Sequence, residues 1–228
     1  MPLKNYKKFL NKFLDNKYEF IFFNEFKEKS VNKIILRHDV DLDIDLALKM
    51  AEIENSLGVK SIYFFLLTNQ SYNLISDSNI KKVTGIKKLG HQISLHFDLS
   101  IYDNPKKGFA MEKKIFNNVF NEDIYITSIH RPNSSFLANP ENFFEISNTY
   151  EKKYIKKIAY FADSGGSFRF GNPLKSKEFL DNKNIQLCIH PIWWINSYEN
   201  VNLTLENNLV KKSIENKVHF KKTIKSFI

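Results

Sequence analysis

Four short apolar runs of the sequence each end in a histidine, and this recurrence constrains the fold more than any other feature. The histidines are His38, His96, His130 and His190, and each run before them has the length of one β-strand. Runs that are apolar along nearly their whole length are typical of parallel strands buried on both faces. Because the carboxyl ends of parallel strands converge on one mouth, we expect the four histidines to lie close together there. That convergence points to an active site.

Helix-like segments separate these runs, so the chain alternates between strands and helices. Alternation at this spacing predicts an α/β fold with six to seven parallel strands, as a closed or distorted barrel or as an open doubly wound sheet. No Gly-x-Gly-x-x-Gly turn follows the first strand, which disfavours a dinucleotide-binding sheet. The expected strands are 33–39, 61–67, 91–97, 124–130, 157–162 and 184–190, and the expected helices are 43–57, 77–89, 107–120, 140–148, 175–181 and 203–226.

The length of 228 residues suits one large domain. Residues 3–29 carry apolar side chains at helical spacing, among them Phe9 and Phe13, so we predict an N-terminal helical extension over residues 1–30 that caps a main domain of residues 31–228. No apolar stretch is long enough to cross a membrane, and the amino terminus lacks the apolar core of a signal peptide. We therefore expect a cytoplasmic protein without a transmembrane segment.

The formal net charge of +9 first suggests a nucleic-acid partner. The lysines are scattered along helix-like segments, however, and the chain has no nucleic-acid-binding motif, so we expect no nucleic acid as partner. An anionic glycan or a nucleotide-sugar is compatible with the charge. The single cysteine, Cys188, lies inside an apolar run, which predicts a buried structural thiol.

Two pairs of polar residues at strand ends have the chemistry of metal ligands. Asp39 and Asp41 are two positions apart, so both carboxylates project to one side of a strand, and a bound cation relieves their repulsion. The alternative is that Asp41 or Asp43 caps the following helix. His96 and Asp98 also share a face, and imidazole with carboxylate is a ligand set for Zn²⁺ or another divalent ion. Their alternative is a structural hydrogen-bonded pair.

Three further segments carry candidate catalytic or substrate contacts. Residues 130–132, His-Arg-Pro, place a fixed cation after a strand, suited either to a structural role or to gripping a carboxylate of the enzyme or an anion of the substrate. Residues 190–194 join a proton donor to two aromatic rings, which either form a platform for a sugar or pack in the core. Residues 163–169 form a polar, glycine-rich loop after a strand. The candidates are His130, Arg131, Asp163, Ser164, Arg169, His190, Trp193 and Trp194.

Taken in order, five segments resemble the motifs of the polysaccharide deacetylases of carbohydrate esterase family four, the NodB-like superfamily. The resemblance covers roughly residues 32–195, and it is stronger to a divergent branch associated with surface-polysaccharide biosynthesis. It implies a distorted (β/α) barrel and a metal-dependent hydrolase that removes an acetyl or formyl group from the nitrogen of an amino sugar. The implied substrate is a carbohydrate or nucleotide-sugar of surface-glycan biosynthesis. The segments are 37–41, 90–98, 130–132, 163–169 and 187–190.

The resemblance also implies catalytic roles. Asp39 is the implied general base that activates a metal-bound water, and His190 is the implied acid that protonates the departing amine. Arg131 and Asp163 are implied to orient the base and that histidine. Asp39 and Asp41 are separated by one residue where the family has adjacent carboxylates, so their two roles are interchangeable at this point.

The implied metal ligands are Asp41 and His96, and zinc is the expected ion. The family has a second histidine four positions after the first, and this chain has Ser100 there. Serine is a poor ligand for zinc, so we expect Asp98 or His130 to complete the site if the metal is retained.

Two alternatives to deacetylation stay open. The same residues suit hydrolysis of another non-peptide C–N bond, as in a cyclic imide, a urea or a uronamide. The departure at Ser100 also suits a glycan-binding homologue that has lost catalysis. The residues expected to contact the substrate are His38, Ser164, Arg169, Trp193 and Trp194.

Overall fold

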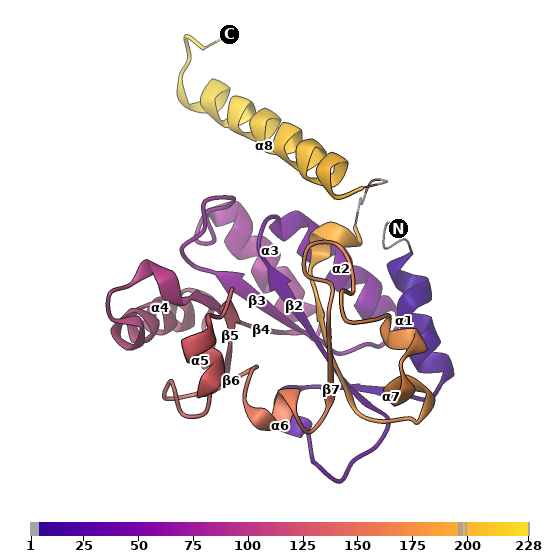
Figure 1. Cartoon of the computed structure of the whole chain (residues 1–228). Coiled ribbons are helices and arrows are strands. Elements are labelled where there is room, and N and C mark those ends of the chain that lie inside the picture. Colours follow the sequence, from indigo (N-terminus) through magenta and orange to yellow (C-terminus); the bar gives the residue numbers. More distant parts are fainter. Residues whose placement is uncertain (1–4, 196–197, 199, 228) are drawn as a thin grey trace.

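A computed structural model describes residues 5–195, 198 and 200–227, and it contains one sheet in which every neighbouring pair of strands is parallel (Figure 1). The path of the sheet is β6-β5-β4-β3-β2-β8-β7, and β1 pairs with β2 beside this path. These strands form a curled half-barrel in a single domain, which confirms the predicted distorted (β/α) barrel. The strands are β1 (Glu19–Ile21), β2 (Lys33–Val40), β3 (Ile62–Leu66), β4 (Gln92–Asp98), β5 (Ile126–His130), β6 (Ser147–Asn148), β7 (Ala159–Ala162) and β8 (Ile185–Ile189).

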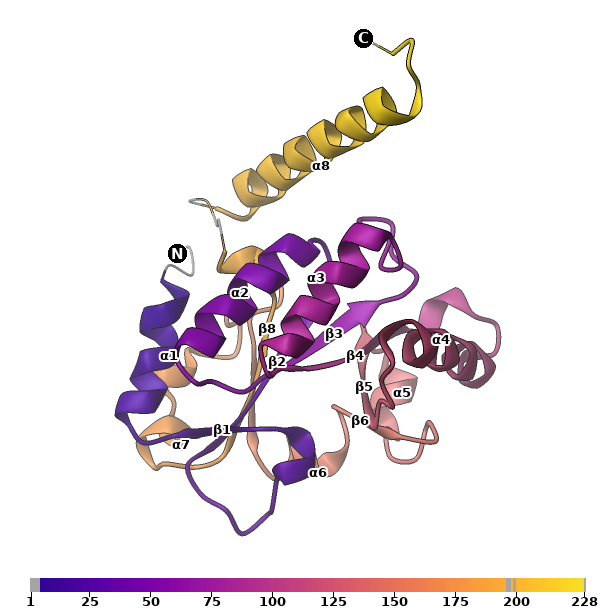
Figure 2. The ribbon, with the colours of Figure 1, turned by 180° about the vertical axis from the view of Figure 1, so that it is seen from behind.

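Helices cover the outside of the curled sheet, and α2 runs beside α3 in both views (Figures 1 and 2). Side chains that accept from free backbone N–H groups fix where several of them begin, as Asp43 does for α2 and Asn104 for α4. The α-helices are α1 (Tyr6–Asp15), α2 (Ile44–Ser56), α3 (Asp77–Lys88), α4 (Pro105–Phe120), α5 (Ser134–Ala138), α6 (Lys152–Ile155), α7 (Lys177–Leu180) and α8 (Val201–Thr223). The 3₁₀ helices are η1 (Phe23–Glu25), η2 (Leu99–Ile101), η3 (Pro173–Lys175) and η4 (Pro191–Trp193).

A buried arginine of the central strand bridges the two ends of the sheet. Arg37 of β2 donates to the hydroxyl of Thr149, just after β6. Its Nη2 lies 3.2 Å from the hydroxyl oxygens of Tyr150 and of Tyr160, which belongs to β7. Since β6 and β7 are opposite edges of the sheet, these bonds hold the curl closed over the inner face of β2.

The structure corrects two of the predicted helices. The helix expected over residues 3–29 ends at Asp15, where Lys17 takes a left-handed conformation with φ 60°, and β1 then pairs with the first half of β2. The helix expected over residues 140–148 is absent from this described stretch, because Asn142 is left-handed and the amide of Asn148 bonds to the carbonyl of Pro140 at 2.7 Å. The other predicted strands and helices are confirmed within a few residues. The domain boundary at residue 30 stays a prediction.

The last helix, α8, projects away from the sheet (Figures 1 and 2). Its amino-terminal half is tied to the start of α2, where Lys211 Nζ lies 2.7 Å from the carboxylate of Asp43 and 3.0 Å from that of Asp45. Among the described helices, none has the length and apolar character that crossing a membrane requires.

Candidate metal and catalytic site

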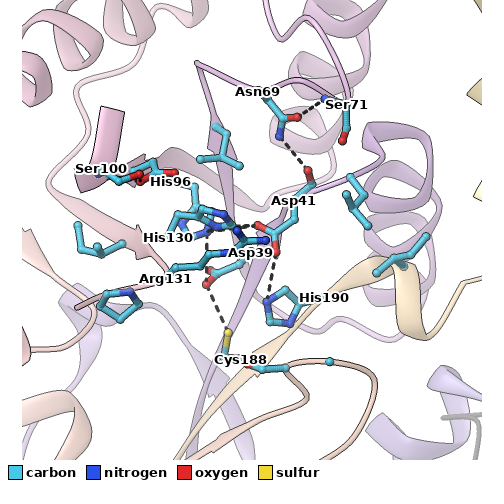
Figure 3. Close-up of a pocket in the computed structure, with 18 of the residues that line it drawn as sticks. Asp39, Asp41, Asn69, Ser71, His96, Ser100, His130, Arg131, Cys188 and His190 are labelled. Carbon is cyan, nitrogen blue, oxygen red and sulfur yellow. Dashed lines mark hydrogen bonds and ion pairs between the residues drawn. The ribbon is translucent and has the colours of Figure 1, made fainter. Parts of the chain in front are cut away.

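The carboxyl ends of the strands open into a cavity of about 950 Å³. Figure 3 shows Asp39, Asp41, His96, His130 and His190 pointing toward one another within it. Of the predicted site residues, those that line the cavity are Asp39, Asp41, His96, Asp98, His130, Arg131, Ser164, Arg169, His190 and Trp193.

Three residues bring ligand atoms together at the centre of the cavity. Asp41 Oδ1 lies 3.3 Å from both His96 Nε2 and His130 Nδ1, and these two nitrogens are 3.2 Å apart. A tetrahedral zinc ion with bonds of about 2.0 Å places its ligands about 3.3 Å apart. The spacing of the three atoms would therefore suit such an ion, which Asp41, His96 and His130 would hold. The residues present fit a divalent metal.

The local structure explains why Asp41 is available. The amide of Asn69 donates to the backbone carbonyl of Asp41 at 2.8 Å, which fixes the chain just beyond β2. The predicted cap of the following helix, Asp41 or Asp43, is confirmed for Asp43, which accepts hydrogen bonds from the backbone of Asp45 and Leu46 and so leaves Asp41 for the cavity. Burial would raise the pKa of Asp41, but its contacts with His130 and His96, aided by His190, lower it well below the usual range.

The third ligand atom comes from His130, one of the two candidates that we predicted. Asp98, the other, accepts hydrogen bonds from the backbone and hydroxyl of Ser100 at 2.8 and 2.7 Å and caps η2. It is therefore engaged outside the group formed by Asp41, His96 and His130. This arrangement also excludes a structural His96–Asp98 pair.

Asp39 is a buried carboxylate in which one oxygen has interaction partners and the other has no hydrogen-bond partner among the described residues. Its Oδ2 lies 3.4 Å from Arg37 Nη2 and accepts from Ser128 Oγ at 3.1 Å and Cys188 Sγ at 3.5 Å. Its Oδ1 has no hydrogen-bond partner among the described residues. Burial alone would raise the pKa of Asp39, but the Arg37 charge, aided by His96, lowers it. Asp39 is therefore an ionised base with an unoccupied acceptor.

Arg37 is a functional residue that our sequence prediction missed. We expected Arg131 to orient Asp39, but Arg131 is exposed and, within residues 5–195, forms no ion pair. Arg37 takes that place from the same strand. The signal was in the sequence: side chains alternate along a strand, so Arg37, Asp39 and Asp41 all share one face.

His190 is held by a carboxylate behind it. Its Nδ1 lies 2.6 Å from Asp163 Oδ1, and Trp194 Nε1 donates to Asp163 Oδ2 at 2.7 Å. Because an ionised carboxylate only accepts, Nδ1 carries a proton and Nε2 faces Asp41 Oδ2 at 3.7 Å. Burial would lower the pKa of His190, but Asp163, together with Asp41 and Asp39, raises it to about 9. The contact between Asp163 and His190 is the one that we predicted.

Two predicted substrate contacts are wrong. His38 is 0% exposed and faces away from the cavity, because it alternates with Arg37 and Asp39 along β2. Trp194 is 6% exposed and packs against Phe9 at a centroid distance of 4.7 Å, so it supports Asp163 instead of a sugar. The predicted burial of the Cys188 thiol is confirmed.

A second cluster of histidine and carboxylate lies behind the sheet. Glu54 of α2 accepts from Tyr6, from Ser61 at 2.6 Å and from Tyr63 at 2.8 Å, and its Oε1 lies 2.7 Å from His38 Nε2. His38 Nδ1 in turn lies 3.1 Å from the carbonyl of Ile189. Both oxygens of Glu54 are satisfied, and the residues of this cluster do not line the cavity.

Comparison with known proteins finds similarity of the backbone fold but not of the sequence. No family model matches this sequence, and no curated protein does. Similar solved structures include a CE4 family pseudoenzyme from Bacillus anthracis, with 11% identity and a TM-score of 0.46 over 80% of this chain and 60% of that chain. A family 4 acetyl xylan esterase from Clostridium thermocellum in complex with a cobalt ion has 8% identity and a TM-score of 0.45 over 81% and 84% of the two chains.

The Streptococcus pyogenes deacetylase PplD in complex with acetate has 15% identity and a TM-score of 0.45 over 87% of this chain and 84% of that chain. This chain spans about 60% of the length of the Bacillus anthracis protein. The geometry of the site therefore carries the functional argument.

Proposed function

We propose that this protein is a metal-dependent hydrolase that removes an acetyl or formyl group from the nitrogen of an amino sugar in surface-glycan biosynthesis. One observation supports this most: the ligand atoms of Asp41, His96 and His130 meet between a free base atom on Asp39 and a protonated His190. A divalent ion, zinc in our proposal, lowers the pKa of a bound water and polarises an amide carbonyl when it occupies such a site.

The base in this proposal is Asp39. Its Oδ1 takes the proton of the attacking water, because this atom is ionised and has no other partner in the described structure. The bonds from Arg37 and Ser128 to Oδ2 keep the carboxylate from rotating away. They also leave the basic oxygen free.

The acid is His190. Amine expulsion needs a proton on nitrogen, and a pKa of about 9 keeps His190 protonated at neutral pH. Asp163 and Trp194 fix the ring so that its Nε2 points to the reacting centre. The two proton transfers therefore use different residues, one on β2 and one directly after β8.

The substrate side of the cavity offers a ring for a sugar. Trp193 is half-buried and lines the cavity, as Ser164 does. An indole face presented in this way packs against the apolar face of a pyranose. We assign Trp193 and Ser164 to sugar binding.

The direct test is product release. Purified protein is depleted of metal, reconstituted with Zn²⁺, Co²⁺ or Mn²⁺, and assayed for acetate and formate from acetamido- and formamido-sugars. We expect release that depends on metal, and we expect Asp39→Gln to abolish it. No acyl release with any of the metals would overturn the proposal. Ammonia release from a uronamide, urea or cyclic imide would then indicate the neighbouring C–N hydrolysis, and sugar binding without turnover would indicate a binding protein.

A further inference from the structure

Arginine is almost confined to the site in this chain. Of 34 Lys and Arg residues only Arg37, Arg131 and Arg169 are arginine. Arg37 lies behind Asp39, and the other two line the cavity. Lysine provides the charge everywhere else. Arginine differs from lysine in its planar fork of N–H donors, which matches a carboxylate or a phosphate. The distribution therefore indicates recognition of an anion at the cavity.

Arg131 is held in an unfavourable backbone conformation directly after a metal ligand. Its φ is 45°, in the left-handed region, and Pro132 follows it. Both features disfavour the conformation for a residue that is not glycine. The guanidinium is exposed in the cavity. His130 and Arg131 are consecutive, so the metal ligand anchors the segment that presents this cation.

Arg169 is folded back over a glycine. A Cβ atom added to Gly165 would lie 2.6 Å from Arg169 Nη2, and Gly165 has a φ of +70°. Glycine suits this position, because it accepts the left-handed conformation and leaves room for the guanidinium. The loop begins at Asp163, which holds His190. Each cavity arginine is thus carried by a segment anchored at the catalytic centre.

The carboxylates of the cavity have other partners. Asp39 is paired with Arg37, Asp41 with the two histidines, and Asp98 with Ser100. Neither Arg131 nor Arg169 is in an ion pair within the described ranges 5–195, 198 and 200–227. Both residues are exposed and line the cavity, so an anion that enters it can reach them.

We propose that Arg131 and Arg169 form a subsite for an anionic group of the substrate, a carboxylate or a phosphate, next to the reacting amide. The position of the amide in this inference rests on the proposed function. The binding of an anion rests on the two arginines alone. The substrate is then a charged amino sugar, either a uronic acid or a sugar phosphate, including the diphosphate of a nucleotide-sugar.

The test measures binding, so that it does not depend on turnover. Isothermal titration compares N-acetylglucosamine with its 1-phosphate, with UDP-N-acetylglucosamine and with the corresponding N-acetylated uronic acid. Both the metal-loaded protein and its His190→Gln variant are titrated. We expect at least one anionic sugar to bind about tenfold or more tightly than the neutral one. The two phosphate ligands and the uronic acid distinguish the source of the anion.

Substitutions then locate the preference. Arg131→Gln and Arg169→Gln should each reduce it, Arg169→Lys should retain only part of it, and the exposed Lys49→Gln on α2 should leave it intact as the matched loss of one charge. Equal binding of neutral and anionic sugars, or a preference that survives both glutamine variants, would overturn the subsite even if the hydrolase is active. Selective anion binding without any acyl release would uphold the subsite and reject the proposed function.

Discussion

Two clusters of histidine and carboxylate lie on opposite faces of β2 and differ in how completely their polar atoms are paired. In the cluster around Glu54, every carboxylate oxygen has a hydrogen-bond partner and His38 uses both ring nitrogens. At the cavity, Asp39 Oδ1 and Asp41 Oδ1 are buried without a hydrogen-bond partner among the described residues. The residue types are the same in both places.

The difference in pairing indicates that the cluster around Glu54 stabilises the fold and that the cluster at the cavity serves binding and catalysis. A closed hydrogen-bond network stabilises the fold because no buried polar group pays an uncompensated desolvation cost. A site that must bind a metal and a substrate keeps acceptors and donors unpaired until they arrive. We therefore expect substitutions in the Glu54 cluster to change stability, and substitutions at the cavity to change activity.

The largest effect is expected from the catalytic acid. His190→Gln removes the proton donor while Asp163 keeps a hydrogen-bonding neighbour, so kcat should fall roughly 10²–10⁴-fold. The free energy of unfolding should also fall, because the buried carboxylate of Asp163 loses its charged partner, so kcat is compared on protein that is shown to be folded. Steady-state kinetics and urea unfolding measure the two quantities. Retained turnover would remove His190 from the mechanism.

The reverse pattern is expected for Glu54→Ala. Removing this carboxylate leaves His38, Tyr6 and Tyr63 without their acceptor inside the protein, which should cost about 3–5 kcal/mol of unfolding free energy. Glu52→Ala, on the exposed side of the same helix, is the matched control. Protein that remains folded should still bind metal. Equal stability of the two variants would show that the cluster around Glu54 contributes nothing.

Glu112 sharpens the comparison, because it is buried and forms no ion pair with any residue that the structure describes. It is 1% exposed and accepts from Tyr102 at 2.7 Å, while its Oε2 has no partner among the described residues. Burial raises its pKa to about 7. Such an acid contributes stability below its unfolded pKa, and that contribution is lost as pH rises through the folded pKa.

The wild-type protein should therefore lose stability as the pH rises from 5 to 8, and Glu112→Gln should lose less. The variant should exceed the wild type by on the order of 2–3 kcal/mol above pH 8 and should match it near pH 5. Urea unfolding across this range measures the difference. A gap that is the same at both pH values would mean that Glu112 titrates normally.

The smallest effect is expected at Ser100, which occupies the position of the second histidine in the family pattern. Its hydroxyl bonds to Asp98, not to the ligand atoms, so Ser100→Ala should leave metal affinity unchanged. Competition with a chromogenic chelator measures the affinity. Weaker metal binding in this variant would place Ser100 or Asp98 among the ligands.

The strands were predictable because each is a short apolar run that is long enough to be buried on its own. β3 is buried along its whole length, and its sequence alone indicates as much. β1 was missed because it has only three residues and is a strand only by pairing with β2. The loop around Asn148 was missed because its shape depends on one side chain that bonds to Pro140.

The site was predictable where topology alone decides, and less so where side-chain direction matters. Parallel strand ends brought Asp41, His96 and His130 together. Side chains alternate between the two faces of β2, so His38 and Arg37 point in opposite directions. Applying this alternation to the sequence would have predicted that Arg37 faces the site and that His38 does not. The role of Glu54 was beyond sequence reasoning, since its partners arrive from helices and strands distant in the chain.

The central claim is that Asp41, His96 and His130 share one cation, and a Co²⁺ titration tests it most directly. We expect metal-free wild-type protein to bind one equivalent with the visible absorption of a tetrahedral site, and His130→Ala to bind more than about 100-fold more weakly. Wild-type protein that binds no metal, or a His130→Ala variant that binds as tightly as the wild type, would contradict the account.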